Sequence, residues 1–235
     1  MVRAGMSTAE AARRCWFVDS KGLVCASRTD LTHHKKPWAH ETEFVKTLME
    51  AIKVFKPTVL IGASGMPASF TPEILQAMAE INERPVIFAL SNPTSKAECT
   101  AEAAYVHTEG RALFASGSPF QPVNYQGKTF QPGQGNNVYI FPGVGLGAIA
   151  TKAKEVTDGM FLTAAETLAS MVTEEERATG NLYPSLKRIR EVSGRIALEV
   201  AKEAFHDGLA QIEKPESIEA LVESLRYTPD YVDYV

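Results

Sequence analysis

Four short apolar runs along the chain each end in a polar or glycine-rich segment. The runs cover residues 16–19, 59–62, 86–92 and 112–117. Stretches with helical periodicity separate the first three runs, at residues 42–56 and at residues 71–81, where Thr71 and Pro72 mark the start. This arrangement predicts parallel strands joined by helical crossovers. Parallel strands bring their carboxyl ends to one edge of a sheet, where open α/β sheets bind ligands. We therefore expect the polar segments to converge on one nucleotide-type crevice.

The polar segments supply the candidate site residues. A tip of small residues lets a flat ligand approach the backbone closely, although a tight turn would have the same composition. The segments are Asp19; Gly62, Ala63, Ser64 and Gly65; Ser91 and Asn92; and residues 116–118.

Asp19 and the lysines near it bear on the cofactor. A carboxylate after a strand can accept hydrogen bonds from a ribose diol, but an Asp before a glycine also favours a plain turn. Ser20, Lys21, Lys35 and Lys36 are close in sequence and could hold a 2′-phosphate, which would favour NADP over NAD. A solvated basic loop is the alternative interpretation.

Two further clusters are rich in amides or glycine. Asn136 and Asn137, like Asn92, could donate to and accept from the carboxylate or hydroxyl of a small substrate, or could be turn residues. The glycines within residues 143–147 lack the spacing of a dinucleotide-binding loop and follow Pro142. They predict close helix packing.

The chain becomes helical after Pro142. Helices are predicted over residues 143–154, 158–172, 186–209 and 215–226. We therefore predict an α/β protein with a Rossmann-like domain at residues 1–150 and a helical part at residues 151–235 that packs on it. The helices could instead form an oligomer interface.

Composition narrows the class of protein. The chain has 235 residues, of which 45% are hydrophobic, and a net charge of −4, so a globular fold is expected and nucleic-acid binding is not. No apolar run approaches the roughly 20 residues that span a bilayer. Three cysteines without a CxxC motif predict reduced thiols, and the histidines match no zinc pattern.

Taken in order, the motifs resemble those of the malic enzymes. The likeness covers nearly the whole chain, and residues 35–40 are similar to the plant-type NADP-dependent branch. The segments that carry it are residues 16–23, 56–62, 70–73, 82–94, 97–102, 114–120, 132–137 and 139–143.

The resemblance implies oxidative decarboxylation of L-malate to pyruvate and CO₂ with NADP, or with NAD, and with Mg²⁺ or Mn²⁺. It implies that Asn92 and one or both of Asn136 and Asn137 contact the substrate. It places Asp19, Ser20, Lys21, Lys35, Gly62, Ala63, Ser64, Gly65, Ser91 and Asn92 along the cofactor.

The resemblance also implies that much of the machinery lies outside this chain. The general acid, the general base, the metal ligands, the first Rossmann strand and its Gly-rich loop have no counterpart here, so we expect an N-terminally truncated doubly wound sheet without catalytic or metal-binding residues. The fragment alone is expected to be inactive, and the complete enzyme to be a homo-oligomer. The alternative is a catalytically silent nucleotide-binding or dimerising remnant. We expect a cytoplasmic protein, with plastid and mitochondrion left open because the natural N-terminus is missing.

Overall fold

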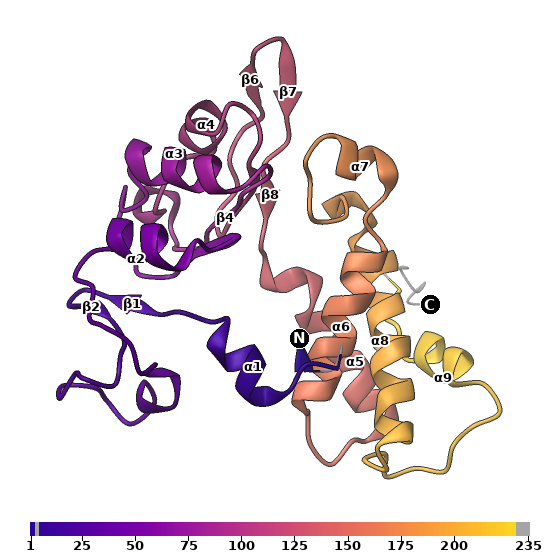
Figure 1. Ribbon diagram of the computed structural model, residues 1–235. Coiled ribbons are helices and arrows are strands. Elements are labelled where there is room, and N and C mark those ends of the chain that lie inside the picture. Colours follow the sequence, from indigo (N-terminus) through magenta and orange to yellow (C-terminus); the bar gives the residue numbers. More distant parts are fainter. Residues whose placement is uncertain (3–4, 229–235) are drawn as a thin grey trace. The chain divides into compact units, whose positions relative to one another are not determined.

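The computed structural model describes residues 1–2 and 5–228 and divides the chain into two compact units, Met1–Leu113 and Phe114–Val235 (Figure 1). The predicted domain boundary at residue 150 stays a prediction. The last seven residues of the predicted helical part, 229–235, lie outside the described part of the chain.

A four-stranded sheet confirms the α/β class. Its strand order is β3 (Val59–Gly62), β4 (Val86–Ala89), β5 (Leu113–Ser116), β8 (Gly133–Gln134). β3 and β4 run parallel, as do β5 and β8. The predicted runs at residues 59, 86 and 112 thus became strands, whereas β8 was missed because two residues carry no periodicity.

Local signals set the ends of the helices in the first unit. Ser7 and Glu10 form a capping box, and so do Thr47 and Glu50, which makes the second helix begin later than residue 42. Thr71 and a proline at the first helical position start the third helix as predicted. The helices are α1 (Thr8–Arg13), α2 (Leu48–Phe55), α3 (Pro72–Ile81) and α4 (Ala101–His107), with short 3₁₀ turns at Lys36–Trp38 and Thr94–Lys96.

The core of the first unit lies along α3, which contacts α2 and α4 (Figure 1). Leu75 and Met78 on α3 are fully buried, as is Ile87 on β4. Burial of such side chains stabilises a fold by about 1.5–3 kcal/mol each. These buried side chains belong to the same unit as β3, β4 and the polar segments that follow them.

The prediction that residues 16–19 form a parallel strand of the sheet was wrong. β1 (Val18–Asp19) pairs antiparallel with β2 (Gly22–Leu23) in a separate hairpin. The backbone N–H of Lys21 donates to Asp19 Oδ1 at 2.9 Å, and Gly22 has a φ of +120°, a conformation that side-chain-bearing residues rarely adopt. The chain therefore reverses at once, and Asp19 does not follow a strand of the parallel sheet.

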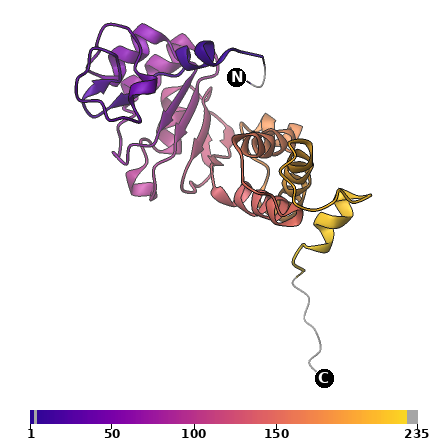
Figure 2. The ribbon, with the colours of Figure 1, turned by 90° about the horizontal axis from the view of Figure 1, so that it is seen from below.

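The second unit is mostly helical. In Figure 2, α5 (Phe141–Thr151), α6 (Asp158–Ser170) and α8 (Ile189–His206) lie side by side, as their mutual contacts require. The remaining elements are α7 (Glu174–Ala178), α9 (Ile218–Ser224), the hairpin β6 (Val123–Tyr125) with β7 (Lys128–Phe130), and 3₁₀ turns at Asn137–Tyr139 and Leu186–Arg188. The hairpin and α7 were not predicted.

Glycines on α5 permit its close approach to α8. A Cβ atom on Gly143 would lie 2.6 Å from Ile196 Cγ2, and one on Gly147 would lie 2.7 Å from the carbonyl oxygen of Ala197. A Cβ atom on Gly145 would meet nothing within 4 Å. The prediction that these glycines serve helix packing is confirmed for Gly143 and Gly147.

Gly147 and Gly145 provide a matched test of the α5–α8 packing. We expect Gly147→Ala to lower the free energy of unfolding by about 1–3 kcal/mol, because the methyl group has no room. Gly145→Ala should raise it by about 0.5–1 kcal/mol, since alanine loses less backbone entropy in a helix. Urea denaturation of both variants measures this, and equal effects would contradict the packing.

Candidate functional site

The ends of β3 and β4 are joined by one buried carboxylate, that of Glu98. The Glu98 side chain is fully buried. Its Oε1 accepts hydrogen bonds from Ser91 Oγ at 2.5 Å, from Ser64 Oγ at 3.1 Å and from Ser64 N at 3.0 Å. Its Oε2 accepts from Ser91 N at 3.3 Å. Four donors from two strand ends therefore meet on one side chain.

Further hydrogen bonds tie the two strand ends to each other. The backbone N–H of Gly65 donates to Ser91 Oγ at 2.8 Å, and that of Leu90 donates to the Gly62 carbonyl at 2.9 Å. The structure thus brings the Gly62–Gly65 tip and Ser91 together, as the parallel pairing of β3 and β4 predicts. Asn92, which follows Ser91, is exposed and precedes Pro93 through a cis peptide bond.

Gly62 leaves the room that Glu98 needs. A Cβ atom on Gly62 would lie 2.5 Å from Glu98 Cδ and 2.8 Å from Phe70 Cζ. Gly65 has a different role, since it has a φ of +67° and open space around it. Of the two glycines, one admits the carboxylate and the other turns the chain.

The environment keeps Glu98 ionised. Burial by itself would raise the pKa of this carboxyl group, but hydrogen bonds from Ser91 and Ser64 outweigh it and lower the pKa below its ordinary value. Sequence reasoning did not select Glu98. The available signal was a charged residue between Ala97 and Cys99, in a stretch where the neighbours are small and apolar.

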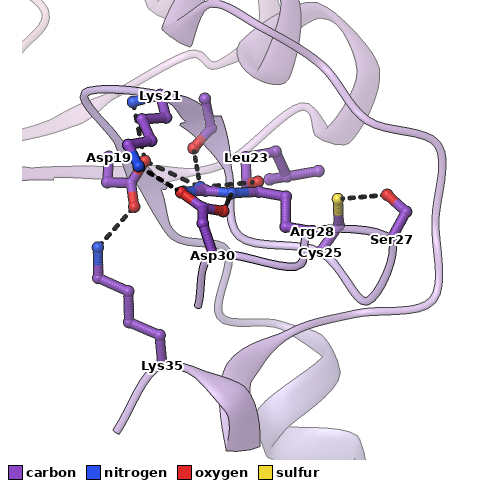
Figure 3. A network of polar contacts seen from close by, with 9 residues as sticks. Asp19, Lys21, Leu23, Cys25, Ser27, Arg28, Asp30 and Lys35 are labelled. Atoms are coloured by element: carbon purple, nitrogen blue, oxygen red, sulfur yellow. Dashed lines mark hydrogen bonds and ion pairs between the residues drawn. The ribbon is translucent and has the colours of Figure 1, made fainter. Parts of the chain in front are cut away.

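Asp19 lies in a second polar network, which Figure 3 shows from close by. Its Oδ1 accepts from Arg28 Nη1 at 2.9 Å, and its Oδ2 pairs with Lys35 Nζ at 2.5 Å. Arg28 also pairs with Asp30 at 2.9 Å, and Lys21 pairs with Asp30 at 2.7 Å. The turn after β1 and the loop that contains Lys35 are therefore held together by charge.

This network carries an excess of one positive charge, because three cationic side chains meet two carboxylates. Burial alone would raise the pKa of Asp19, but hydrogen bonds from Arg28 and Lys35 hold it well below its usual range. Arg28, whose side chain is only 9% exposed, was missed by the sequence reasoning. Lys36 is exposed and forms no ion pair among the residues that the structure describes.

Asn136 and Asn137 belong to the second unit. The Asn136 side chain caps the following 3₁₀ turn, accepting from Val138 N at 2.9 Å, whereas Asn137 is exposed. Asn92 belongs to the first unit, so the convergence of the three amides on one crevice stays a prediction. The same holds for the cofactor contacts predicted at Ser20, Lys21 and residues 62–65.

The second unit also contains a cavity of about 470 Å³. Phe120, Tyr139 and Glu176 are among its lining residues. None of the residues that the sequence selected as candidates lines it, so it is no part of the predicted site.

Comparison with known proteins decides the family. Residues 1–205 match the family described as "Malic enzyme, NAD binding domain". The chain belongs to the malic enzyme family. The malic-enzyme resemblance in the sequence is thereby confirmed, and a nucleotide cofactor is the coarser conclusion that the family supports.

Several malic enzymes are similar over almost the whole chain. An NADP-dependent malic enzyme of Dictyostelium discoideum is 55% identical over 97% of this chain and 42% of its own length. One from Vitis vinifera is 54% identical over 96% of this chain and 38% of its own length. The chain therefore spans about two fifths of the length of these relatives.

A solved malic enzyme shares the fold. The Entamoeba histolytica enzyme superposes with a TM-score of 0.70 and 25% identity, covering 89% of this chain and 41% of that chain. A relative from Arabidopsis thaliana, 51% identical, is named as chloroplastic.

The described residues contain neither a candidate metal cluster nor a candidate membrane span. Within residues 1–2 and 5–228, no group of three or more His, Cys, Asp or Glu side chains could hold a metal ion. No helix in the described part of this malic enzyme chain is long and apolar enough to cross a membrane.

The Asp19 network predicts a dependence of stability on pH. Because the pKa of Asp19 is depressed in the folded state, its contribution is complete above the unfolded value of about 3.9 and is lost as the pH falls towards the folded value. We expect Asp19→Asn to lower the free energy of unfolding at pH 7 by on the order of 1–3 kcal/mol. The difference from wild type should shrink below about pH 4.

Denaturation series from pH 7 to about pH 2 on both proteins measure this, with Glu80→Gln on exposed α3 surface as the control. A difference between wild type and Asp19→Asn that does not change with pH would show that the ion pairs contribute nothing.

Proposed function

We propose that this chain is the cofactor-binding part of an NADP-dependent malic enzyme, which converts L-malate to pyruvate and CO₂. The observation that carries the proposal is the family match over residues 1–205. The joined ends of β3 and β4 support it, because open α/β sheets bind ligands outside the carboxyl ends of their strands.

The Asp19 network favours NADP as the cofactor. A bare carboxylate at this position would repel a 2′-phosphate, but Lys35 and Arg28 neutralise Asp19 and leave one positive charge in excess. A contact between an ammonium group and a phosphate is charge-assisted and stronger than a neutral hydrogen bond. We assign Lys35 as the main 2′-phosphate contact, with Ser20 and Lys21 beside it. The names of the relatives from Dictyostelium and Vitis agree with this choice.

The substrate is assigned to the amides. Asn92, next to the Glu98 network, would bind one end of malate, and Asn136 or Asn137 the other. Amides suit this role because they donate and accept without changing charge during the reaction. The tip from Gly62 to Gly65 and the segment Ser91–Asn92 would lie along the cofactor.

Proton transfer and metal binding are assigned to residues outside this chain. The described residues do not form a site that fits Mg²⁺ or Mn²⁺, since no group of three carboxylate, histidine or cysteine side chains is present among them. In this proposal the chain orients cofactor and substrate, and the complete protein is a homo-oligomer in the cytoplasm, a plastid or a mitochondrion.

The division of labour predicts that the chain alone is inactive. A fusion in which it replaces the aligned region of the Dictyostelium discoideum relative should form NADPH from malate with Mn²⁺, whereas the purified chain should not. Each general acid–base role contributes roughly 10²–10⁴-fold, so without them turnover should be undetectable. The absorbance of NADPH measures the activity of both proteins.

Two outcomes would contradict this assignment. Malate-dependent NADPH formation by the purified chain would place the catalytic groups within it. A folded fusion without activity would favour the alternative, a catalytically silent nucleotide-binding or dimerising protein.

Lys35 and Lys36 form a matched pair for testing cofactor choice. In the active fusion, Lys35→Ala should raise KM for NADP about tenfold, or about 1.4 kcal/mol, and leave KM for NAD nearly unchanged. Lys36→Ala, which removes an exposed neighbouring ammonium group, is the control. If the double variant kept the wild-type preference for NADP, the two lysines would be a solvated loop and the NADP assignment would fall.

A further inference from the structure

We infer that Glu98 is a positioning residue of the site, which acts through Ser64 and Ser91 on the groups that bind cofactor and substrate. The expected effect of Glu98 on substrate and cofactor binding rests on the proposed function. The hydrogen bonds of Glu98 are independent of that function. Glu98 is fully buried and accepts four hydrogen bonds from the residues that follow β3 and β4.

The two serines are turned towards Glu98. Ser91 Oγ donates to Glu98 Oε1 and accepts from Gly65 N, and Ser64 Oγ donates to the same carboxylate oxygen and accepts from Met66 N at 3.2 Å. Each hydroxyl has one proton, which it donates in its hydrogen bond to the Glu98 carboxylate. The two hydroxyls therefore hold the loops in place instead of donating to a ligand.

Asn92 depends on this arrangement through the backbone. Glu98 Oε2 holds the N–H of Ser91, the residue immediately before Asn92. Glu98 also receives the loop from the other strand end, through Ser64 N. A change at Glu98 would thus displace the predicted substrate amide and the glycine-rich tip together.

Only a carboxylate satisfies all four donors. Both oxygens of Glu98 accept, whereas a glutamine of the same shape offers one acceptor and one donor group. The amide of Glu98→Gln would direct N–H groups at Ser91 N or at the serine hydroxyls. In either orientation of the amide, at least one of the four donors loses its acceptor, which weakens the link between the two loops even though volume and packing are conserved.

The first experiment uses the 235-residue chain without any ligand. Amide hydrogen exchange, followed by NMR, should be at least about tenfold faster at Ser64, Gly65 and Ser91 in Glu98→Gln than in wild type, because their local opening costs less free energy. Glu102→Gln, an exposed change on α4, should leave all three amides unchanged. Equal exchange in Glu98→Gln and wild type would overturn the inference.

The second experiment uses the active fusion and separates positioning from folding. Glu98→Gln should raise KM for malate about tenfold, or about 1.4 kcal/mol, with kcat within about twofold of wild type. If Glu98 were needed only for folding, the substitution would reduce the fraction of active enzyme. The apparent kcat per total protein would then fall at an unchanged KM. That outcome would overturn the inference.

Ser91→Ala supplies the second variant, because it removes one donor without changing any charge. Coupled residues are non-additive, so Ser91→Ala in the Glu98→Gln background should add little to the malate KM. Additive effects would contradict a shared role. If the wild-type fusion made no NADPH, the proposed function would fail, while hydrogen exchange would still decide the role of Glu98.

Discussion

The burial of one ionised carboxylate constrains the whole region around the ends of β3 and β4. A charge without water is costly unless hydrogen bonds replace the water, and Glu98 is fully buried. Its two oxygens are met by two backbone N–H groups and two serine hydroxyls. The requirement fixes more than the serines, because Gly62 must lack a side chain for the carboxylate to fit.

The Asp19 network balances charge in a different way, through ion pairs that lie nearer the surface. Its ion pairs involve Lys21, whose side chain is 68% exposed, as well as Arg28, which is largely buried. Exposed pairs contribute little to stability, so the contacts of Arg28 with Asp19 and Asp30 are the ones that shape the turn. Neutralising Asp19 also changes what this turn can attract, from a ribose hydroxyl alone to a phosphate. In the proposed function, one ion-pair network thus sets both the local structure and the choice of cofactor.

The sequence predicted features whose cause is local. The start of α3 at Thr71 and Pro72, the strands β3 and β4, and the glycine packing of α5 all follow from neighbouring residues or from simple periodicity. The hairpin of β1 was misread because its apolar run looks like any other strand, and pairing direction depends on the turn that follows. The candidate residues Ser64 and Ser91 were selected from their place after strands.

The features that could not be predicted from the sequence depend on contacts between residues far apart in the chain. Glu98 is 34 residues from Ser64, and no local pattern tells a buried glutamate from a solvated one. Arg28 likewise pairs with Asp19, nine residues earlier, across a turn that the sequence treated only as an alternative. The family likeness supplied the proposed function, whereas the structure supplied the side chains that hold the loops.

The most direct test of this account is the ionisation of Glu98 itself. The Cδ carbon of a glutamate labelled with ¹³C reports its protonation by NMR, and a pH titration of the chain would follow that signal. The account predicts that Glu98 stays ionised at pH values where an ordinary glutamate, with a pKa of about 4.3, has already taken up a proton. A Glu98 signal that titrates at or above that value would show a buried neutral acid, and the hydrogen-bonded anion at the centre of the account would be wrong.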